Sequence, residues 1–173
     1  MAARGYDLIP PRRRAGLPPF ELDGFVCKHC RNFVSSAFLL CGVHNRNHCP
    51  YCLWSRHLDL EAAGDRLSAC KALMRPIGLT VKQTRRKYGF GRGELMLIHL
   101  CSDCGRLSIN RLAADDDREN LFIVFEQSLR MEAPLRQRLA SERILPLSEQ
   151  EIGSVRSQLF GALDRPGLLP EPI

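Results

Sequence analysis

The sequence lacks any long apolar run. None of its 173 residues belongs to a stretch that approaches the ~20 consecutive apolar residues of a membrane span. The segment after Met1 is polar and rich in proline and arginine, so it has no apolar region of the kind that a secretory signal peptide needs. We therefore expect a cytoplasmic protein with no membrane-spanning segment.

The common sequence motifs of nucleotide-binding and hydrolytic enzymes are also missing. We find no P-loop, no nucleophile elbow and no dinucleotide-binding fingerprint. There is no internal repeat, and residues 112–173 contain no cysteine. What is present is a 45% share of hydrophobic residues, which is enough for a packed core rather than a disordered chain.

Cysteine is the residue that the sequence uses most unusually. There are eight cysteines, and six of them form three C-x-x-C pairs, Cys27/Cys30, Cys49/Cys52 and Cys101/Cys104. In a reducing compartment such pairs are typical of metal ligands rather than of disulfides, because two thiolates on one tight turn can reach the same ion. Three pairs within 78 residues favour zinc over a redox dithiol or an iron–sulfur cluster.

The spacing predicts two Zn²⁺ sites but leaves two ways to divide the ligands. In a sequential arrangement, site one contains Cys27, Cys30, Cys49 and Cys52, and site two contains His57, Cys70, Cys101 and Cys104. In the rival arrangement, a long ribbon joins Cys27/Cys30 to Cys101/Cys104, and Cys49, Cys52, Cys70 and a histidine form an inserted site. Cys41 has no pair; it is expected to be a small buried residue, or else to replace His57 in a four-cysteine site.

The metal-binding region is predicted to be small α+β, built on zinc-knuckle β-hairpins in the manner of a zinc ribbon. The apolar segments Phe33–Leu40 and Glu94–Leu100 predict strands, and Leu107–Ile109 is the expected hairpin partner of the second. Residues Leu58–Leu73 predict short helical stretches that end at Pro76–Gly78.

A helical extension is expected after the last cysteine. Asp115–Asp117 precede a helical pattern of apolar residues, and Pro134 should end or kink that helix. Ser148 and Glu151 have the spacing of a capping box. The box is followed by one apolar face at helical spacing, made by Ile152, Val155, Leu159 and Leu163.

Positive charge is concentrated in two segments. The net charge is +6, yet residues 1–20 carry about +3, residues 71–111 about +7 and residues 112–173 about −4. Localised positive charge attracts a polyanion far better than the same charge spread thinly. The first segment is a Pro/Arg-rich arm at residues 1–23, with Arg12, Arg13 and Arg14.

The second segment mixes cations with aromatic residues and glycines. It contains Lys82, Arg85, Arg86, Lys87, Tyr88, Phe90 and Arg92. Cations of this kind neutralise phosphates, and exposed aromatic rings stack on unpaired bases. A solvated hairpin loop is the plainer interpretation, but the aromatic residues and the second basic arm favour contact with RNA.

Residues Arg46-Asn47-His48-Cys49-Pro50 carry a resemblance to a known family. With the residues that follow up to Asp59, and with Cys70, the Cys101/Cys104 pair and Asn110-Arg111, the chain is similar to the RNHCP-domain family over about residues 24–115. The resemblance implies a small zinc-binding domain whose ligands are the eight residues of the two sequential sites. It implies no particular activity, and it leaves Cys41 outside the ligand set.

The polar residues of this signature have two interpretations. In one, Asp59 or Asp65 orients His57 as a hydrogen-bond acceptor, while Arg66 and Arg111 pair with these acids. In the other, Arg46 and its neighbours Asn47 and His48 point outward and meet phosphates or base edges.

These observations predict a zinc-binding, non-catalytic RNA-binding protein that is associated with ribosomes or with translation. The expected organisation is a basic arm at 1–23, a metal-binding domain at 24–115 and a helical extension at 116–173. One alternative is a metal-dependent nuclease of the HNH type, with His48, His57, Asp59 or Asp65 around a catalytic ion. Another is a protein-interaction module whose partner binds the C-terminal helices.

Overall fold

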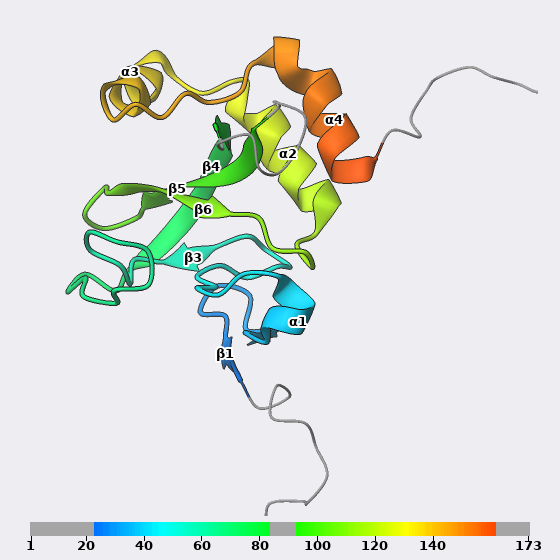
Figure 1. Ribbon diagram of the computed structural model, residues 1–173. Coiled ribbons are helices and arrows are strands. Elements are labelled where there is room, and N and C mark those ends of the chain that lie inside the picture. Colours follow the sequence, from blue (N-terminus) through cyan, green and yellow to red (C-terminus); the bar gives the residue numbers. More distant parts are fainter. Residues whose placement is uncertain (1–22, 84–92, 162–173) are drawn as a thin grey trace, which may run out of the picture.

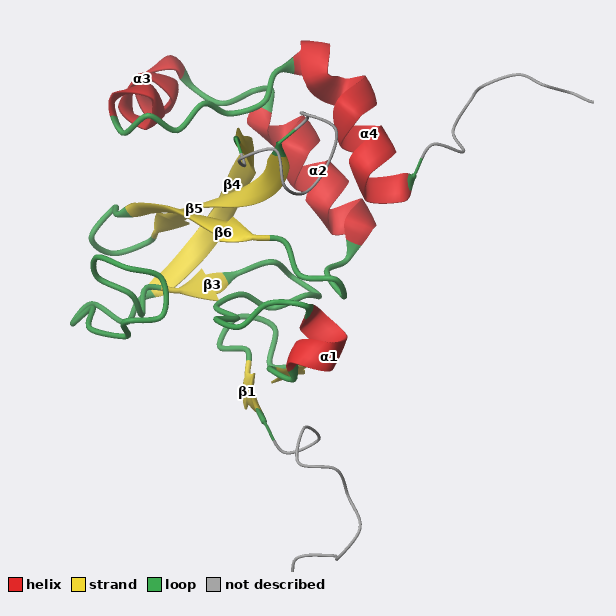
Figure 2. Ribbon diagram, viewed as in Figure 1, coloured by secondary structure: helices red, strands yellow, loops and turns green. Residues whose placement is uncertain are grey.

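A four-stranded antiparallel sheet lies between a small N-terminal lobe and three helices in the computed structural model, which describes residues 23–83 and 93–161 (Figure 1). The strands are β3 (Ser55–Arg56), β4 (Leu73–Lys82), β5 (Glu94–Cys101) and β6 (Leu107–Arg111), in the order β3-β4-β5-β6. The fold is therefore the small α+β architecture that the sequence predicts, with strands and helices in separate layers (Figure 2).

The β4–β5 hairpin is the longest element of the sheet. It pairs Met74 with Cys101 at one end and Lys82 with Glu94 at the other, and β6 pairs with β5 as expected. The register shifts between Pro76 and Gly78, which is the kind of irregularity at which a strand tolerates proline. The prediction that these residues end a helix is wrong, because they lie inside β4.

The chain between β3 and β4 also differs from the prediction. None of the described residues of Leu58–Leu73 forms a helix, and Leu73 already belongs to β4. The Asp65 carboxylate instead accepts hydrogen bonds from the backbone N–H groups of Leu60, Glu61 and Ala62. Such bonds from a side chain to the nearby backbone compete with the bonds of a helix, so Asp65 stabilises the segment as a loop.

The N-terminal lobe consists of β1 (Gly24–Val26), β2 (Phe33–Ser35) and the single helical turn α1 (Phe38–Cys41). β1 and β2 form a two-stranded antiparallel pair. The predicted strand Phe33–Leu40 is correct only to Ser35, because the chain then turns and ends α1 at Gly42, whose φ of 68° is left-handed. This turn buries Cys41 completely and leaves Leu39 82% exposed.

The C-terminal part forms helices α2 (Arg118–Ser128), α3 (Ala133–Ser141) and α4 (Ile152–Phe160). The Asp117 side chain caps α2 by accepting from the Asn120 N–H, as its acidic start predicts. Pro134 lies in the first turn of α3 rather than ending α2. The Ser148/Glu151 capping box forms, and it begins the 3₁₀ helix η2 (Glu149–Glu151) that leads into α4.

The main core lies between the sheet and helices α2 and α4 (Figure 1). Its fully buried members include Leu79 and Leu97 from the sheet, Phe125 from α2 and Val155 from α4. Gly78 permits this packing, since a Cβ there would lie 3.0 Å from the Cβ of Ser128 in α2. Leu163 of the predicted apolar face lies outside the described residues. Within the described ranges, no helix has the length and apolar character to cross a membrane.

Candidate metal centres

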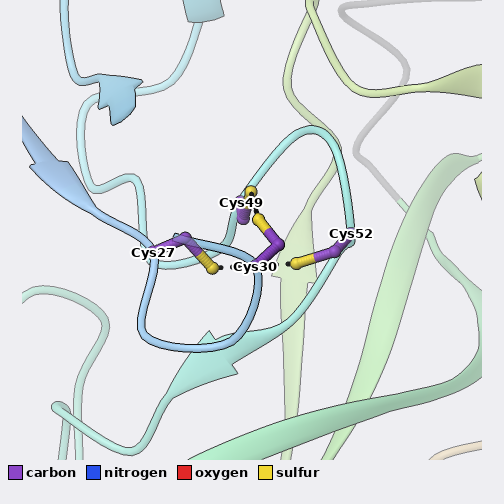
Figure 3. Close-up of side chains that lie close together, drawn as sticks. All are labelled: Cys27, Cys30, Cys49 and Cys52. Atoms are coloured by element: carbon purple, nitrogen blue, oxygen red, sulfur yellow. Dashed lines mark hydrogen bonds between the residues drawn. The ribbon is translucent and has the colours of Figure 1, made fainter. Parts of the chain in front are cut away.

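Four cysteines converge between the N-terminal lobe and the loop before β3, as Figure 3 shows. The Sγ atoms of Cys27 and Cys52 are 3.7 Å apart, and those of Cys30 and Cys49 are 3.5 Å apart. A disulfide would need about 2.05 Å, whereas four thiolates at about 2.3 Å from one tetrahedral zinc ion are separated by about 3.8 Å. The spacing of cluster one, Cys27/Cys30/Cys49/Cys52, therefore fits a single metal ion.

The three C-x-x-C turns have the same backbone geometry. In each turn the N–H of the first cysteine donates to the carbonyl of the residue five positions later, which is Asn32, Trp54 or Arg106. The residue after the second cysteine has a left-handed φ in each turn: 67° at Arg31, 61° at Leu53 and 74° at Gly105. All three turns therefore use a left-handed residue at this position, and of the three only Gly105 adopts it without the steric cost of a Cβ atom.

A second cluster forms at the end of the main sheet. Cluster two contains His57 after β3, Cys70 before β4, and Cys101 and Cys104 from the β5–β6 turn. The Cys70 and Cys101 Sγ atoms are 3.6 Å apart, and the Cys104 Sγ atom is 3.2 Å from Nδ1 of His57. In each cluster the four ligand atoms all lie within 4.8 Å of one another.

The two clusters have the sequential arrangement and not the ribbon arrangement. Each offers four donor atoms from the protein, of the sulfur and nitrogen types that zinc prefers. Cys41 belongs to neither cluster and is fully buried, with its thiol near the carbonyl oxygen of Val43. The residues present therefore fit two structural zinc ions, which would hold the knuckles together and supply no open coordination position.

The thiols of cluster one do not ionise equally without a metal ion. Burial raises the pKa of Cys49 to about 11 and also raises that of Cys52. Burial opposes ionisation of Cys30 as well, but hydrogen bonds from the Asn32 backbone and from neighbouring thiols lower its pKa to about 7. A divalent cation removes this conflict, because it replaces the protons that the crowded thiols would otherwise share.

His57 presents its Nδ1 side to the thiols, so its Nε2 points away from cluster two. Nε2 is buried and has no hydrogen-bond partner among the described residues. The prediction that Asp59 or Asp65 orients His57 is wrong. Asp59 accepts from the Asn47 side chain and the Gly64 N–H, and Asp65 holds the loop at 60–62. A zinc-bound histidine usually donates its second ring N–H to a hydrogen-bond acceptor. His57 has none among the described residues, which distinguishes this site.

The signature residues Arg46 and His48 point into the protein. Arg46 is 3% exposed, and its guanidinium donates to both carboxylate oxygens of Asp115 at 2.8 Å and to Asp116 at 3.4 Å. Nε2 of His48 lies 2.8 Å from the same Asp116, and His48 is 1% exposed. The prediction that Arg46 contacts RNA is wrong, because its side chain is enclosed and fully used.

This network of hydrogen bonds connects the N-terminal lobe to the start of α2. Arg46 also donates to the carbonyl of Ser35 in β2, and Asp116 accepts from the Ala113 N–H. From the sequence, Asp115–Asp117 were predicted only to start a helix, and nothing in the spacing of residues 46 and 115 indicates that they meet. A buried arginine needs a buried carboxylate, and this requirement is the one signal that could have suggested the pairing.

Asn47 is also used within the protein. Its side chain donates to Asp59 at 2.7 Å and accepts from Arg66. Arg66 lies 3.9 Å from Asp59, whereas Arg111 pairs with Glu94 at 2.9 Å rather than with the predicted acids. The signature is thus mainly a set of internal contacts around the two clusters.

The other residues predicted to bind RNA lie at or beyond the edges of the described structure. Lys82 is exposed at the end of β4. Outside the described residues lie Arg12, Arg13, Arg14, Arg85, Arg86, Lys87, Tyr88, Phe90 and Arg92.

Comparison with known proteins gives one family. The family model described as RNHCP domain matches residues 22–122, a segment that contains both clusters and the Asp115–Asp116 pair. No curated protein and no solved structure shows a significant match to the chain.

Proposed function

Because this chain belongs to the RNHCP-domain family and carries two four-ligand metal centres, we propose that it is a zinc-binding, non-catalytic RNA-binding protein of the cytoplasm, associated with ribosomes or translation. In this proposal zinc has a structural role. The N-terminal lobe is too small to be stable through its apolar contacts alone, and metal binding supplies the missing folding free energy.

The observation that carries the RNA proposal is the charge of the β4–β5 connection. Between Lys82 and Gly93 the chain has five cations, two aromatic residues and no acid. Lys82 pairs with Glu94, the residue just after this segment, at the end of the hairpin opposite to cluster two. In this proposal, contact of these cations with phosphates releases counterions from the RNA.

The nuclease alternative has less support. His48 is 1% exposed and enclosed against Asp116, so it does not reach solvent in the way that a catalytic histidine must. The Asn47 side chain is bonded to Asp59. Each cluster already has four protein ligands, whereas catalytic zinc keeps a position open for water or substrate.

RNA binding is tested with the zinc-loaded, full-length chain. We expect binding to weaken steeply as salt rises, and to weaken further when Arg85, Arg86 and Lys87 are all replaced by alanine. The matched control is Arg143→Ala, which removes an exposed cation from the loop after α3. In cell extracts, the tagged protein should sediment with ribosomal subunits. RNA affinity that is equal in the triple variant and the wild type would reject the assignment of the basic segment.

A further inference from the structure

A groove lies between the C-x-x-C turn of Cys49/Cys52 and helix α2. It consists of two adjoining hollows, each with a volume of about 370 Å³, that share the lining residues Arg75, Pro76, Val124 and Gln127. The first hollow reaches Tyr51 and Trp54 of the turn, and the second reaches Arg130 and Leu135 beyond the end of α2. The groove therefore follows α2 from the first zinc cluster to the start of α3.

The zinc end of the groove is aromatic. Tyr51 is 53% exposed, so its ring is open to a ligand. Trp54 is partly exposed and stacks on His29 of the neighbouring C-x-x-C turn, with ring centroids 4.2 Å apart and an angle of 6° between the planes. Both turns carry ligands of cluster one, so the Trp54 ring that stacks between them is held in place before any ligand binds.

Two arginines in the lining of the groove have no carboxylate partner in the described structure. Arg75 and Arg130 are exposed, and neither has a carboxylate partner in the part of the chain that the structure describes. By contrast, Arg111 and Arg138 at other surfaces pair with Glu94 and Glu142. The described lining of the two hollows has one acidic side chain, Glu132, at the far end.

We propose that this groove binds single-stranded RNA, with unpaired bases stacking at Tyr51 and Trp54 and phosphates meeting Arg75 and Arg130. The inference rests on the proposed RNA-binding function and assigns it a second contact surface. Stacking platforms combined with unpaired cations are the usual chemistry of single-strand recognition, because every base offers a flat face and every nucleotide a charge. A duplex hides its base faces and would not reach the aromatic end.

The groove and the basic β4–β5 connection can be tested separately. Arg75 lies in β4 beside the pair of Met74 with Cys101, whereas Lys82 ends the same strand. At about 3.3 Å per residue, the two positions are more than about 20 Å apart along the strand. A substitution in one surface therefore leaves the other intact.

Trp54 is the single tryptophan of the chain, so its fluorescence reports on the groove. We expect an oligouridylate of about eight nucleotides to quench this fluorescence in the zinc-loaded protein. Tyr51→Ala should weaken binding about tenfold, because it removes a stacking surface. Tyr51→Phe should keep the affinity of the wild type, since it keeps the ring. Both variants should retain two zinc ions.

The cations are tested by Arg75→Ala and Arg130→Ala, with Arg143→Ala as the matched control outside the groove. Each groove variant should weaken binding and reduce the dependence of log Kd on log salt by about one unit. The control should change neither quantity by a comparable amount.

The outcomes separate this inference from the proposed function. RNA binding that is lost in the Arg85/Arg86/Lys87 triple variant but unchanged in the groove variants, with no quenching of Trp54, would overturn the groove and leave RNA binding in place. If neither oligouridylate nor total cellular RNA binds at low salt, both proposals fail. Quenching by an acidic peptide but not by RNA would also overturn the groove assignment and identify a protein partner.

Discussion

The two zinc clusters have similar ligands but very different surroundings. Cluster one lies in a lobe with little apolar packing. Val34 is the one buried residue that packs with Cys27 and Cys49 in the described structure. Cluster two closes the end of a sheet whose core contains eleven buried residues, including Leu79, Leu97 and Phe125. The first ion would thus take the place of a hydrophobic core, whereas the second would attach a loop to a sheet that is already well packed.

The interface between the N-terminal lobe and the main sheet, which we call the seam, is polar. Arg46 and His48 on the lobe side meet Asp115 and Asp116 ahead of α2, and Nε2 of His99 in β5 lies 2.8 Å from the carbonyl oxygen of Leu53. Leu53 itself packs into the main core. Leu53 and several buried hydrogen bonds therefore help to join the lobe to the sheet, and the predictions below test how far the two regions depend on each other.

The largest effect should come from removing a ligand of cluster one. Cys49→Ser should reduce the zinc content from two ions to one and unfold the N-terminal lobe together with the Cys49/Cys52 turn, because zinc binding contributes on the order of 10 kcal/mol to such small domains. The matched variant Cys70→Ser should also lose one ion but keep slow amide exchange in β4 and β5. Zinc analysis and hydrogen exchange measure both. Equal loss of protection in the two variants would contradict the comparison.

Breaking the seam should have the next largest effect. Arg46→Met leaves Asp116 buried without its cation, and we expect a loss of about 3–5 kcal/mol in the free energy of unfolding. The control is Arg111→Met, because the Arg111–Glu94 pair is exposed and should contribute less than about 1 kcal/mol. Urea unfolding of the zinc-loaded proteins measures both changes. Similar values for the two variants would show that Arg46 does not join the regions.

His99 should make stability at the seam depend on pH. Burial, and then the nearby His48, lower the pKa of His99 from 6.5 to about 3, so the folded protein keeps it neutral. The unfolded chain binds a proton between these values, so stability is complete above about pH 6.5 and falls as the pH falls toward 3. Between pH 7 and pH 5 we expect a loss of about 2 kcal/mol.

The control for this pH effect is His99→Gln. Acid also releases zinc from both proteins, so the quantity to compare is the difference between their stability profiles over the same pH range. The wild type should lose more stability than the variant as the pH falls. Parallel profiles would mean that His99 does not contribute the pH dependence.

The smallest effect should be confined to the helical side. Asp117→Ala removes the side-chain cap of α2, and we expect a loss of about 1 kcal/mol with both zinc ions retained. Glu132→Ala at the corresponding position of α3 is the control, since Glu132 makes no side-chain cap. Thermal unfolding of the two zinc-loaded variants measures the difference in their stability. A loss of zinc from Asp117→Ala would contradict the expectation that the effect is confined to the helical side.

Local patterns in the sequence predicted the features that depend on neighbouring residues. C-x-x-C spacing identifies thiols on one turn, apolar segments identify β5 and β6, and the Ser148/Glu151 spacing identifies a helix start. The same reasoning failed for Leu58–Leu73, where the Asp65 side chain competes with a helix, and for Phe33–Leu40, where the apolar residues are not all buried. Apolar composition alone does not tell which residues face a core.

The sequence by itself determined that the chain binds metal through paired thiols, and that a helical part follows the last cysteine. Only the tertiary structure decided which ligands share an ion, that Arg46 and His48 are buried against Asp115 and Asp116, and that Tyr51, Trp54, Arg75 and Arg130 line one groove. The reason is physical: a turn or a cap depends on residues a few positions apart, whereas ion pairing and burial depend on which distant segments the folded sheet brings together.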